Sequence, residues 1–311
     1  MIVLQDNFEK GINLQTYIAL GNFDGLHIGH MGLINKTIEL SKENNAKSLV
    51  YTFSNHPLSV ISKDEGPKLI MSNEAKISLL SKMGIDIINL VKFDESFMKI
   101  APEDFVKNIV NYYKPKGIVV GFNYRFGYKN IGDIKLLEKF SSELNFELHV
   151  IDSVSYENEV VSSTKIRGLI ADGKLEEANK LLLVPFMLEG KIVKGKQLGR
   201  TIGFPTANLQ FDDRFILPKI GVYYTAVEYD GSFYKGITSV GYNPTVEEQT
   251  SRIYVETHIL DFDKNIYNEN LKVYFLSRIR DELKFQSLDD LREQLELDRL
   301  YALSQILENF A

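Results

Sequence analysis

The fold of the first half of the chain is decided by the stretch Ala19-Leu-Gly-Asn-Phe-Asp-Gly-Leu-His-Ile-Gly-His30. The apolar run at residues 17–20 predicts a short buried strand, and Gly21 to Gly25 end that run. A helical spacing follows, whose expected buried positions are Ile28, Met31, Ile34, Ile38 and Ser41. A strand, a glycine-bearing loop and a helix N-terminus form a natural anion site, because unpaired N–H groups and the helix dipole favour negative charge there.

Two of the five histidines in the chain, His27 and His30, lie in the first turn of this helix. Residues three apart share a helix face, so both imidazoles can reach one anion. A glycine-rich turn or a lone histidine is a weak signal, and packing explains most single histidines. The pair directly after the loop indicates a phosphate site.

The motif His-x-Gly-His resembles the phosphate-binding signature of the nucleotidylyl transferases. The longer pattern Gly-x-Phe-Asp-Gly-x-His-x-Gly-His resembles the prokaryotic bifunctional FAD synthetases, which join a riboflavin kinase to an FMN adenylyltransferase. The resemblance implies that His27 and His30 contact the phosphates of ATP. It also implies a binding loop that contains Gly21, Phe23, Asp24 and Gly25.

Composition narrows the class of protein. A length of 311 residues suggests two domains, and 44% apolar residues suffice for two cores. A net charge of −6 argues against a dedicated nucleic-acid binder, and the absence of cysteine excludes disulfides and thiolate metal sites. We see no signal peptide or membrane span in the sequence, so we expect a soluble, cytoplasmic protein.

Strand-like and helix-like segments alternate over the first 150 or so residues. This pattern predicts a Rossmann-like α/β domain with a parallel sheet covered on both faces. After the first strand, the predicted strands are residues 48–53, 86–93, 117–121 and 147–151, and the predicted helices are 29–44, 73–83, 102–113 and 133–144. Ligands bind at the carboxyl ends of the strands in such sheets, so we expect the functional residues in the loops that follow the strands.

Two of these loops carry chemistry. His56 precedes Pro57, which restrains it to an extended conformation at a strand end. The loop Gly121-Phe-Asn-Tyr-Arg-Phe-Gly127 offers aromatic rings with an amide and a cation, which suit a flat isoalloxazine and its phosphate. Both segments resemble family motifs, which implies that His56 lies at the ATP site and that Asn123 and Arg125 lie at the FMN site. Tyr124 stands where the family usually has Phe.

The run Ser162-Ser-Thr-Lys-Ile-Arg167 precedes another helical pattern. A hydroxyl there is ordinarily only an N-cap, but with Lys165 and Arg167 it also forms a second phosphate cradle. The run resembles the family signature Ser-Ser-Thr-x-x-Arg. The resemblance implies that Ser163, Thr164 and Arg167 bind the triphosphate opposite the histidine pair.

A helical stretch ends at Pro185, and the pattern becomes that of short strands with turns between them. We therefore predict two domains: residues 1–184, the FMN adenylyltransferase domain, and residues 185–311, the riboflavin kinase domain. The predicted strands of a small antiparallel β-barrel are residues 187–193, 221–229, 233–240, 252–260 and 271–277. A terminal helix over residues 287–310 is expected to pack on the barrel through Leu288, Leu291, Leu295, Leu303, Ile306 and Leu307.

The second domain opens with a basic, glycine-rich segment that contains Lys196 and Gly203 and ends in Pro205-Thr-Ala-Asn208. The hydroxyl and amide oxygens of Thr206 and Asn208 are hard ligands suited to Mg²⁺. The segment resembles the riboflavin kinase signature Gly-x-x-x-Gly-Phe-Pro-Thr-Ala-Asn, in which Thr and Asn bind Mg–ATP. Lysines alone would indicate only a solvated surface.

Later residues extend this resemblance. Gly241-Tyr-Asn-Pro-Thr-Val246 is similar to a family segment beside the active site, and Tyr254-Val-Glu-Thr-His258 is similar to the strand that bears the catalytic glutamate. Strict alternation alone would place Glu256 on a solvent face, so its role as base is implied by the resemblance. Arg280 and Glu282 lie in a segment similar to one at the flavin site.

The resemblance implies two ATP-dependent reactions: riboflavin to FMN, then FMN to FAD with release of pyrophosphate. Another adenylyltransferase, for pantetheine phosphate or nicotinate mononucleotide, would explain the first domain but not the second. An aminoacyl-tRNA synthetase lacks support, because we find no Lys-Met-Ser-Lys-Ser loop. A non-catalytic flavin or nucleotide sensor would be signalled by the loss of Glu256, the histidine pair or Arg167, and all of them are present. A protein with one inactive site remains an alternative for the sequence alone.

Overall fold

The computed structural model describes residues 1–61, 66–195, 199, 202–242 and 253–307. The chain forms two compact units, Met1–Ser163 and Thr164–Ala311, and each is described by itself. By this division α7 (Ser163–Ala171) and α8 (Leu175–Leu181) group with the second unit. The predicted domain boundary near Val184 stays a prediction. In the part of the chain that is described, no helix is long and apolar enough to span a membrane.

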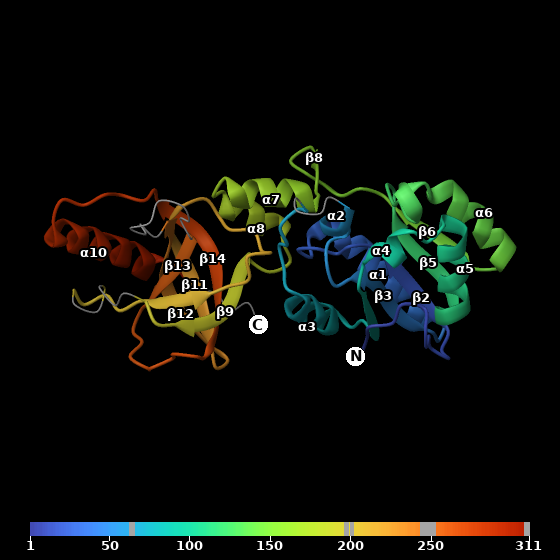
Figure 1. Cartoon of the computed structure of the whole chain (residues 1–311), viewed down its shortest axis with the longest axis horizontal. Coiled ribbons are helices and arrows are strands. Elements are labelled where there is room, and N and C mark those ends of the chain that lie inside the picture. The colour runs from blue at the N-terminus through green and yellow to red at the C-terminus, as the bar shows by residue number, and fades with distance from the viewer. Residues whose placement is uncertain (62–65, 196–198, 200–201, 243–252, 308–311) are drawn as a thin grey trace. The chain divides into compact units, whose positions relative to one another are not determined.

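The first unit contains a six-stranded parallel sheet in the order β1-β4-β3-β2-β5-β6, which confirms the predicted architecture (Figure 1). Its strands are β1 (Ile2–Leu4), β2 (Thr16–Leu20), β3 (Lys47–Phe53), β4 (Ile87–Val91), β5 (Pro115–Gly121) and β6 (Glu147–Ile151). Its helices are α1 (Ile28–Glu43), α2 (Pro57–Ile61), α3 (Asn73–Met83), α4 (Glu95–Met98), α5 (Pro102–Tyr113) and α6 (Ile134–Leu144), with a 3₁₀ turn at Tyr128–Asn130 and a small hairpin of β7 (Ser155–Tyr156) and β8 (Glu159–Val160).

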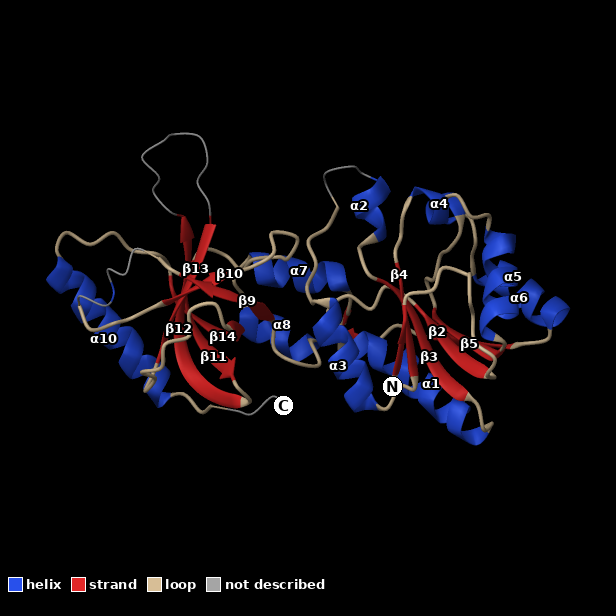
Figure 2. Cartoon of the chain, turned by 60° about the horizontal axis from the view of Figure 1, so that its bottom comes forward, coloured by secondary structure: helices blue, strands red, loops and turns tan. Residues whose placement is uncertain are grey.

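The strand order reverses between β2 and β5, because β2, β3 and β4 run one way across the sheet and β5 and β6 lie on the other side of β2. A crevice forms at such a switch point, outside the carboxyl ends of the strands. The helices α5 and α6 pack on one face of the sheet, and α1 packs on β2, β3 and β5 (Figure 2). The loops after β2 and β5 therefore flank the crevice, and they are the loops with the predicted functional residues.

The buried side of α1 differs from the prediction. The helix buries Leu33, Ile34, Thr37, Leu40 and Ser41, whereas Met31 is 36% exposed. The helix thus faces the sheet with a stripe turned away from Met31 and Ile38. Thr37 is accommodated because its hydroxyl donates to the carbonyl of Leu33 at 2.7 Å. The expectation that Met31 faces the core was wrong.

The second unit contains a closed antiparallel barrel in the order β10-β13-β12-β11-β14-β9, as predicted. Its strands are β9 (Met187–Val193), β10 (Ala207–Gln210), β11 (Gly221–Tyr229), β12 (Ser232–Tyr242), β13 (Ile253–Ile259) and β14 (Asn270–Arg280). The short strand β10 was not predicted, because its residues were interpreted only as a ligand loop. The amide of Asn179 joins α8 to the barrel, since it donates to the carbonyl of Phe275 at 2.8 Å.

The terminal helix α10 (Leu288–Ser304) packs on the barrel through Ala302. The predicted leucine stripe is wrong at Leu288 and Leu303, whereas Leu291 and Leu295 are half-buried. Leu288 is 66% exposed and Leu303 is 40% exposed, whereas Asp298 is only 1% exposed. The surface under α10 offers Arg280, whose guanidinium contacts the Asp298 carboxylate at 2.7–3.1 Å. A charged partner on the barrel therefore decides which face of this helix is buried.

Candidate functional site

The loop between β2 and α1 is fixed by backbone geometry before any ligand binds. Phe23 and Gly25 have positive φ values of 47° and 62°, which turn the chain sharply at the end of β2. The buried carboxylate of Asp24 accepts hydrogen bonds from the backbone N–H groups of Ile70 and Met71 at 3.1–3.4 Å. Asp24 thus acts as an anchor that joins this loop to the segment before α3.

His27 and His30 lie together, as their spacing predicted. Their rings are stacked with centroids 3.6 Å apart and an interplanar angle of 19°. The backbone N–H of His27 donates to Nδ1 of His30 at 3.4 Å, which leaves Nε2 of neutral His30 as the proton-bearing nitrogen. The centroid of the Phe23 ring lies 5.1 Å from the centroid of the His30 ring, so Phe23 packs against this imidazole.

Both imidazoles are neutral near pH 7 in the unliganded protein. Burial lowers the pKa of His27 from 6.5 to about 4. Burial also lowers the pKa of His30, and the charge that His27 carries when protonated and the charge of Lys76 lower it further. A neutral imidazole can still donate one hydrogen bond to a phosphate, so the pair forms a donor site without a fixed charge.

Ser163 joins the second segment of the site to the first. Its hydroxyl donates to the carbonyl of Asp24 at 2.9 Å, and its oxygen lies 3.5 Å from Nε2 of His27. Thr164 and Arg167 follow in α7, which groups with the second unit. Their approach to the imidazoles stays a prediction.

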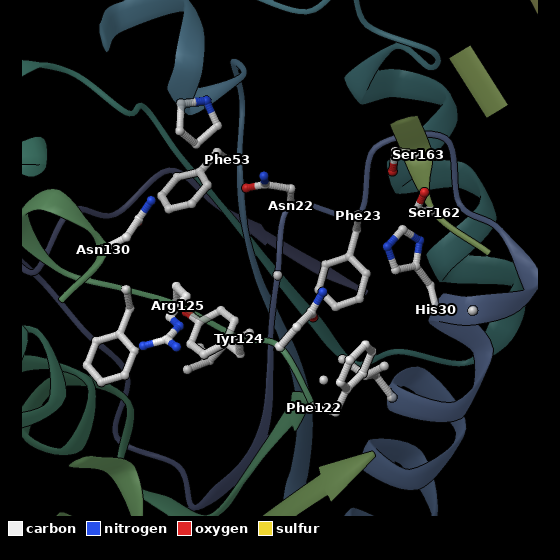
Figure 3. Close-up of a pocket in the computed structure, with 18 of the residues that line it drawn as sticks. Asn22, Phe23, His30, Phe53, Phe122, Tyr124, Arg125, Asn130, Ser162 and Ser163 are labelled. Atoms are coloured by element: carbon white, nitrogen blue, oxygen red, sulfur yellow. The ribbon is translucent and has the colours of Figure 1, made fainter. Parts of the chain in front are cut away.

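A cavity of about 540 Å³ opens beside the imidazole pair at the switch point. Figure 3 shows His30 near Ser162 on one side of this cavity and Arg125 with Asn130 on the other. The predicted residues that line it are Gly21, Phe23, His27, His30, His56, Asn123, Arg125 and Ser163. Asp24 and Gly25 do not line it; they shape the loop from behind, where a Cβ on Gly25 would lie 2.6 Å from Ile70.

The far wall of the cavity is aromatic. It contains residues that the sequence did not single out: Phe53, Phe93, Phe97 and Phe105. They come from the ends of β3 and β4, from α4 and from α5, and their rings pack edge to face at centroid distances of 5.2–6.2 Å. Phe53 and Phe93 lie at the ends of apolar strands and Phe97 and Phe105 lie on helices, and apolar residues in such positions usually indicate core.

In the second unit, the strand register brings predicted residues together. Asn208 on β10 pairs directly with Glu256 on β13, so their side chains lie on the same face of the barrel wall. Both residues are half-buried. His258, two residues along β13, has its ring nitrogen 2.8 Å from the carbonyl of Pro205 and so holds the segment before β10. Burial lowers the pKa of His258.

A second cavity, of about 320 Å³, lies at the end of the barrel. Thr206 lines it, together with Thr257 and the segment Phe262–Tyr267. Asn208 and Glu256 are not among its lining residues, whereas Thr206, two residues before Asn208 in the sequence, is. The contribution of the loop after β13 was not predicted.

Comparison with known proteins agrees with this geometry. The family model described as FAD synthetase matches residues 9–165, and the one described as riboflavin kinase matches residues 182–306. A relative from Listeria monocytogenes described as a bifunctional riboflavin kinase/FMN adenylyltransferase is 35% identical, over 93% of this chain and 92% of its own length. The chain belongs to the bifunctional riboflavin kinase/FMN adenylyltransferase family.

Further relatives support the same assignment. Bifunctional riboflavin kinase/FMN adenylyltransferases from Bacillus subtilis and Escherichia coli are 32% and 35% identical, over 93% and 92% of this chain and 92% and 91% of their own. A solved structure described as a macrolide-efflux protein from Streptococcus pneumoniae matches with a TM-score of 0.89 and 32% identity. That match covers 98% of this chain and 99% of the other.

The remaining residues implied by the family resemblance lie outside the two cavities or outside the described residues. Arg280 was expected near flavin, and its guanidinium is engaged by Asp298, so in this structure it joins β14 to α10. Gly203 has a φ of 86° and lies in the turn before Phe204. Lys196 and residues 243–246 of the Asn-Pro-Thr segment lie outside the described residues.

Proposed function

We propose that the barrel unit transfers the γ-phosphate of ATP to riboflavin and that the first unit transfers the adenylyl group of ATP to FMN. The observation that carries the proposal is the stacked pair His27–His30, which faces a cavity with an aromatic wall at the switch point of the sheet. Groups that donate hydrogen bonds to phosphate and a surface for a flat ring system lie in one site, as a reaction between FMN and ATP requires.

In the adenylyl transfer, a phosphate oxygen of FMN attacks the α-phosphorus of ATP, and the bond to pyrophosphate breaks. The attacking oxygen is already anionic at neutral pH, so no general base is needed. The task of the protein is to bring two anions together and to stabilise the leaving pyrophosphate. Neutral His27 and His30 donate hydrogen bonds to phosphate oxygens, and Ser163, Thr164 and Arg167 add donors from the second segment.

The flavin end of the same cavity has a different character. Phe122 and Tyr124 offer rings to the isoalloxazine, and Asn123 offers an amide to its polar edge. Arg125 contacts Asp133 only at 3.5 Å and is more than half exposed, so its guanidinium can turn to the FMN phosphate. His56 lines the cavity at the end of β3 and lies within the proposed ATP half.

In the kinase reaction, the terminal ribityl hydroxyl attacks the γ-phosphorus of ATP, and ADP leaves. The neutral hydroxyl gains from a base that accepts its proton, and Glu256 is the proposed base. Tyr254, two residues before it on the same face, has its hydroxyl 3.2 Å from Glu282. The adenine of ATP is proposed to occupy the 320 Å³ cavity, with its phosphates directed toward Thr206.

The residues present fit Mg²⁺ in the kinase site. Thr206 and Asn208 supply a hydroxyl and an amide oxygen, and a Cβ on Gly195 would lie 2.3 Å from the amide nitrogen of Asn208, so Gly195 makes room for that side chain. No cluster of three His, Cys, Asp or Glu that could hold a metal ion occurs in the described residues. Bound Mg²⁺ would neutralise phosphate charge on ATP, and the ATP oxygens would complete its coordination.

One assay tests both assignments. With riboflavin, ATP and Mg²⁺, chromatography should show FMN and then FAD. His30→Ala should cause FMN to accumulate. Glu256→Gln should lower FMN formation about 10²-fold or more and leave FAD formation from added FMN unchanged. His149→Ala, a change to an imidazole on β6 away from the cavity, serves as the control. Normal phosphorylation by Glu256→Gln would remove the base assignment.

A further inference from the structure

Lys76 is a buried lysine that neither the sequence motifs nor the proposed mechanism uses. It lies on α3 and is 4% exposed. Its ammonium donates to the carbonyl of Asn22 at 3.2 Å and to the carbonyl of Phe53 at 3.4 Å. These carbonyls belong to the loop that follows β2 and to the last residue of β3, so one side chain bridges two neighbouring strand ends at the edge of the large cavity.

The bridge belongs to a wider connection between α3 and the loops of the site. Asn22 also accepts a hydrogen bond from the hydroxyl of Thr52 at 2.7 Å, and the amide of Asn73 donates to the carbonyl of Ser54 at 2.9 Å. Asp24 receives the backbone N–H groups just before α3. The loop that carries Phe23 and precedes the imidazole pair is therefore fastened to α3 from both of its sides.

A buried charge at this position is costly for stability. Lys76 stands four residues before the buried Leu80, where an amphipathic helix ordinarily has an apolar residue. Burial lowers the pKa of Lys76 to about 8, and the carboxylate of Asp24 acts in the opposite direction. An apolar side chain of similar volume often stabilises a protein more than a buried charge does. The lysine therefore calls for a reason other than stability.

The charge of Lys76 acts on His30, one member of the imidazole pair. The titratable groups around it are Asp24 on the β2–α1 loop, His56 on the loop after β3, and His30 on α1. The positive charge of Lys76 lowers the pKa of His30. A protonated Lys76 therefore favours the neutral form of that imidazole, while its hydrogen bonds hold the two strand ends around it.

We propose that Lys76 is a positioning residue of the adenylyl-transfer site, whose ammonium joins the Asn22 and Phe53 carbonyls and so holds the loop beneath His30 in the arrangement that receives the triphosphate. The inference rests on the proposed function of this unit. It adds a residue that contacts neither substrate and acts through the backbone and through His30.

The first test compares Lys76→Met with Lys82→Met, a change of the same kind at an exposed position on the same helix. Lys76→Met should lower kcat/KM for ATP in FAD formation about 10²-fold, because displacement of catalytic groups by about 1 Å has effects of that size. Riboflavin phosphorylation by the same chain should stay unchanged, and the melting temperature should stay equal or rise. Lys82→Met should change neither activity.

The second test uses pH and the variant Lys76→Arg, because arginine keeps its charge throughout the working range. FAD formation by the natural chain should decline above about pH 8 as Lys76 loses its proton. Lys76→Arg should move this alkaline limb upward by more than one pH unit, because its charge persists. Lys76→Met should remove this alkaline limb. On the acid side, FAD formation by this variant should begin to decline at a higher pH than in the natural chain, because the charge of Lys76 no longer lowers the pKa of His30.

The outcomes separate this inference from the proposed function. If the natural chain forms no FAD, the proposed function is wrong. If it forms FAD and Lys76→Met equals it in kcat/KM and in pH profile, the positioning role is wrong. A parallel loss of FAD formation and folding in Lys76→Met, with an unchanged alkaline limb in Lys76→Arg, would reduce Lys76 to a structural residue and also overturn the proposal.

Discussion

The two proposed sites differ in how their functional side chains meet solvent. In the first unit, His27 is 4% exposed and His30 stacks on it, so the donors are packed and neutral before substrate arrives. In the barrel, Glu256 lies on a half-buried face of β13 beside two other polar side chains. A carboxyl group must be ionised to accept a proton, and contact with water favours its ionised form. A neutral imidazole that donates a hydrogen bond to a phosphate does not need contact with water in order to do so.

The two sites are also fastened differently. The loop of the first site is held by hydrogen bonds to backbone groups, through Asp24 and Lys76. The periphery of the barrel is held by the ion pair Arg280–Asp298, whose side chains are 16% and 1% exposed. A substitution that removes the ion pair of the barrel should therefore leave the first unit folded, and a substitution that removes the hydrogen bonds of the loop should leave the barrel folded.

The largest expected effect is on the barrel. Asp298→Ala leaves the guanidinium of Arg280 partly buried without its carboxylate and should destabilise the barrel unit by about 3–5 kcal/mol. Hydrogen exchange, which reports each unit separately, should show early opening of β14 and α10 while β2 and α1 remain protected. Glu296→Ala is the matched control, because it breaks a 3.4 Å pair on the same helix whose side chains are 43% and 46% exposed. Equal effects of the two variants would contradict the importance of the buried pair.

The sequence predicted elements best where local signals mark both ends. The range of α3 was correct, because Ser72 caps its start and Gly84, with a φ of 94°, ends it. The range of α5 was correct, because Pro102 occupies its first turn. The burial of α10 could not be predicted, because leucine periodicity does not reveal that the barrel surface beneath the helix carries Arg280. The partner of a helix decides which stripe is buried.

The same limit applies to the site. The proximity of His27 and His30 follows from a local spacing of three residues and was predicted, whereas the stacking of their rings was not. Lys76 lies 54 residues from Asn22, the residue whose carbonyl it bonds. Its only local sign was a lysine four residues before a buried leucine. Positioning residues of this kind become visible only when the fold brings distant segments together.

A second prediction concerns the stability of the first unit at acidic pH. The pKa of His27 is about 4 in the folded chain and 6.5 without burial, so the unfolded chain binds the proton more tightly. The stabilising effect of a neutral His27 is fully present above pH 6.5 and is lost as pH falls to about 4, a loss of about 3 kcal/mol. Thermal unfolding followed by hydrogen exchange should show that the first unit loses stability more steeply than the barrel over this range.

The variant His27→Asn should flatten this pH dependence, because asparagine does not titrate. The barrel contains one imidazole of lowered pKa, His258, whereas the first unit contains two that are stacked. Equal slopes in the two units, or an unchanged slope in His27→Asn, would show that buried neutral imidazoles do not distinguish the sites.

The smallest expected effect tests how tightly the imidazole pair is packed. A Cβ on Gly29 would lie 3.0 Å from Cε1 and Nδ1 of His27, and the other face of that ring is covered by His30 at 3.6 Å. The His27 ring would have to shift by a few tenths of an ångström, and that shift disturbs its stacking on His30. Gly29→Ala should therefore lower FAD formation about tenfold, equivalent to about 1.4 kcal/mol, with riboflavin phosphorylation unchanged.

Gly32→Ala is the control on the same helix, since its Cβ would meet only a side-chain methyl of Ile151 at 3.0 Å. Alanine favours a helix over glycine by about 1 kcal/mol, so neither variant should melt early through loss of helix propensity. If Gly29→Ala retains as much FAD formation as Gly32→Ala, then the stacked rings have room to move. The contrast between a packed donor site in the first unit and a half-buried carboxylate in the barrel would then no longer hold.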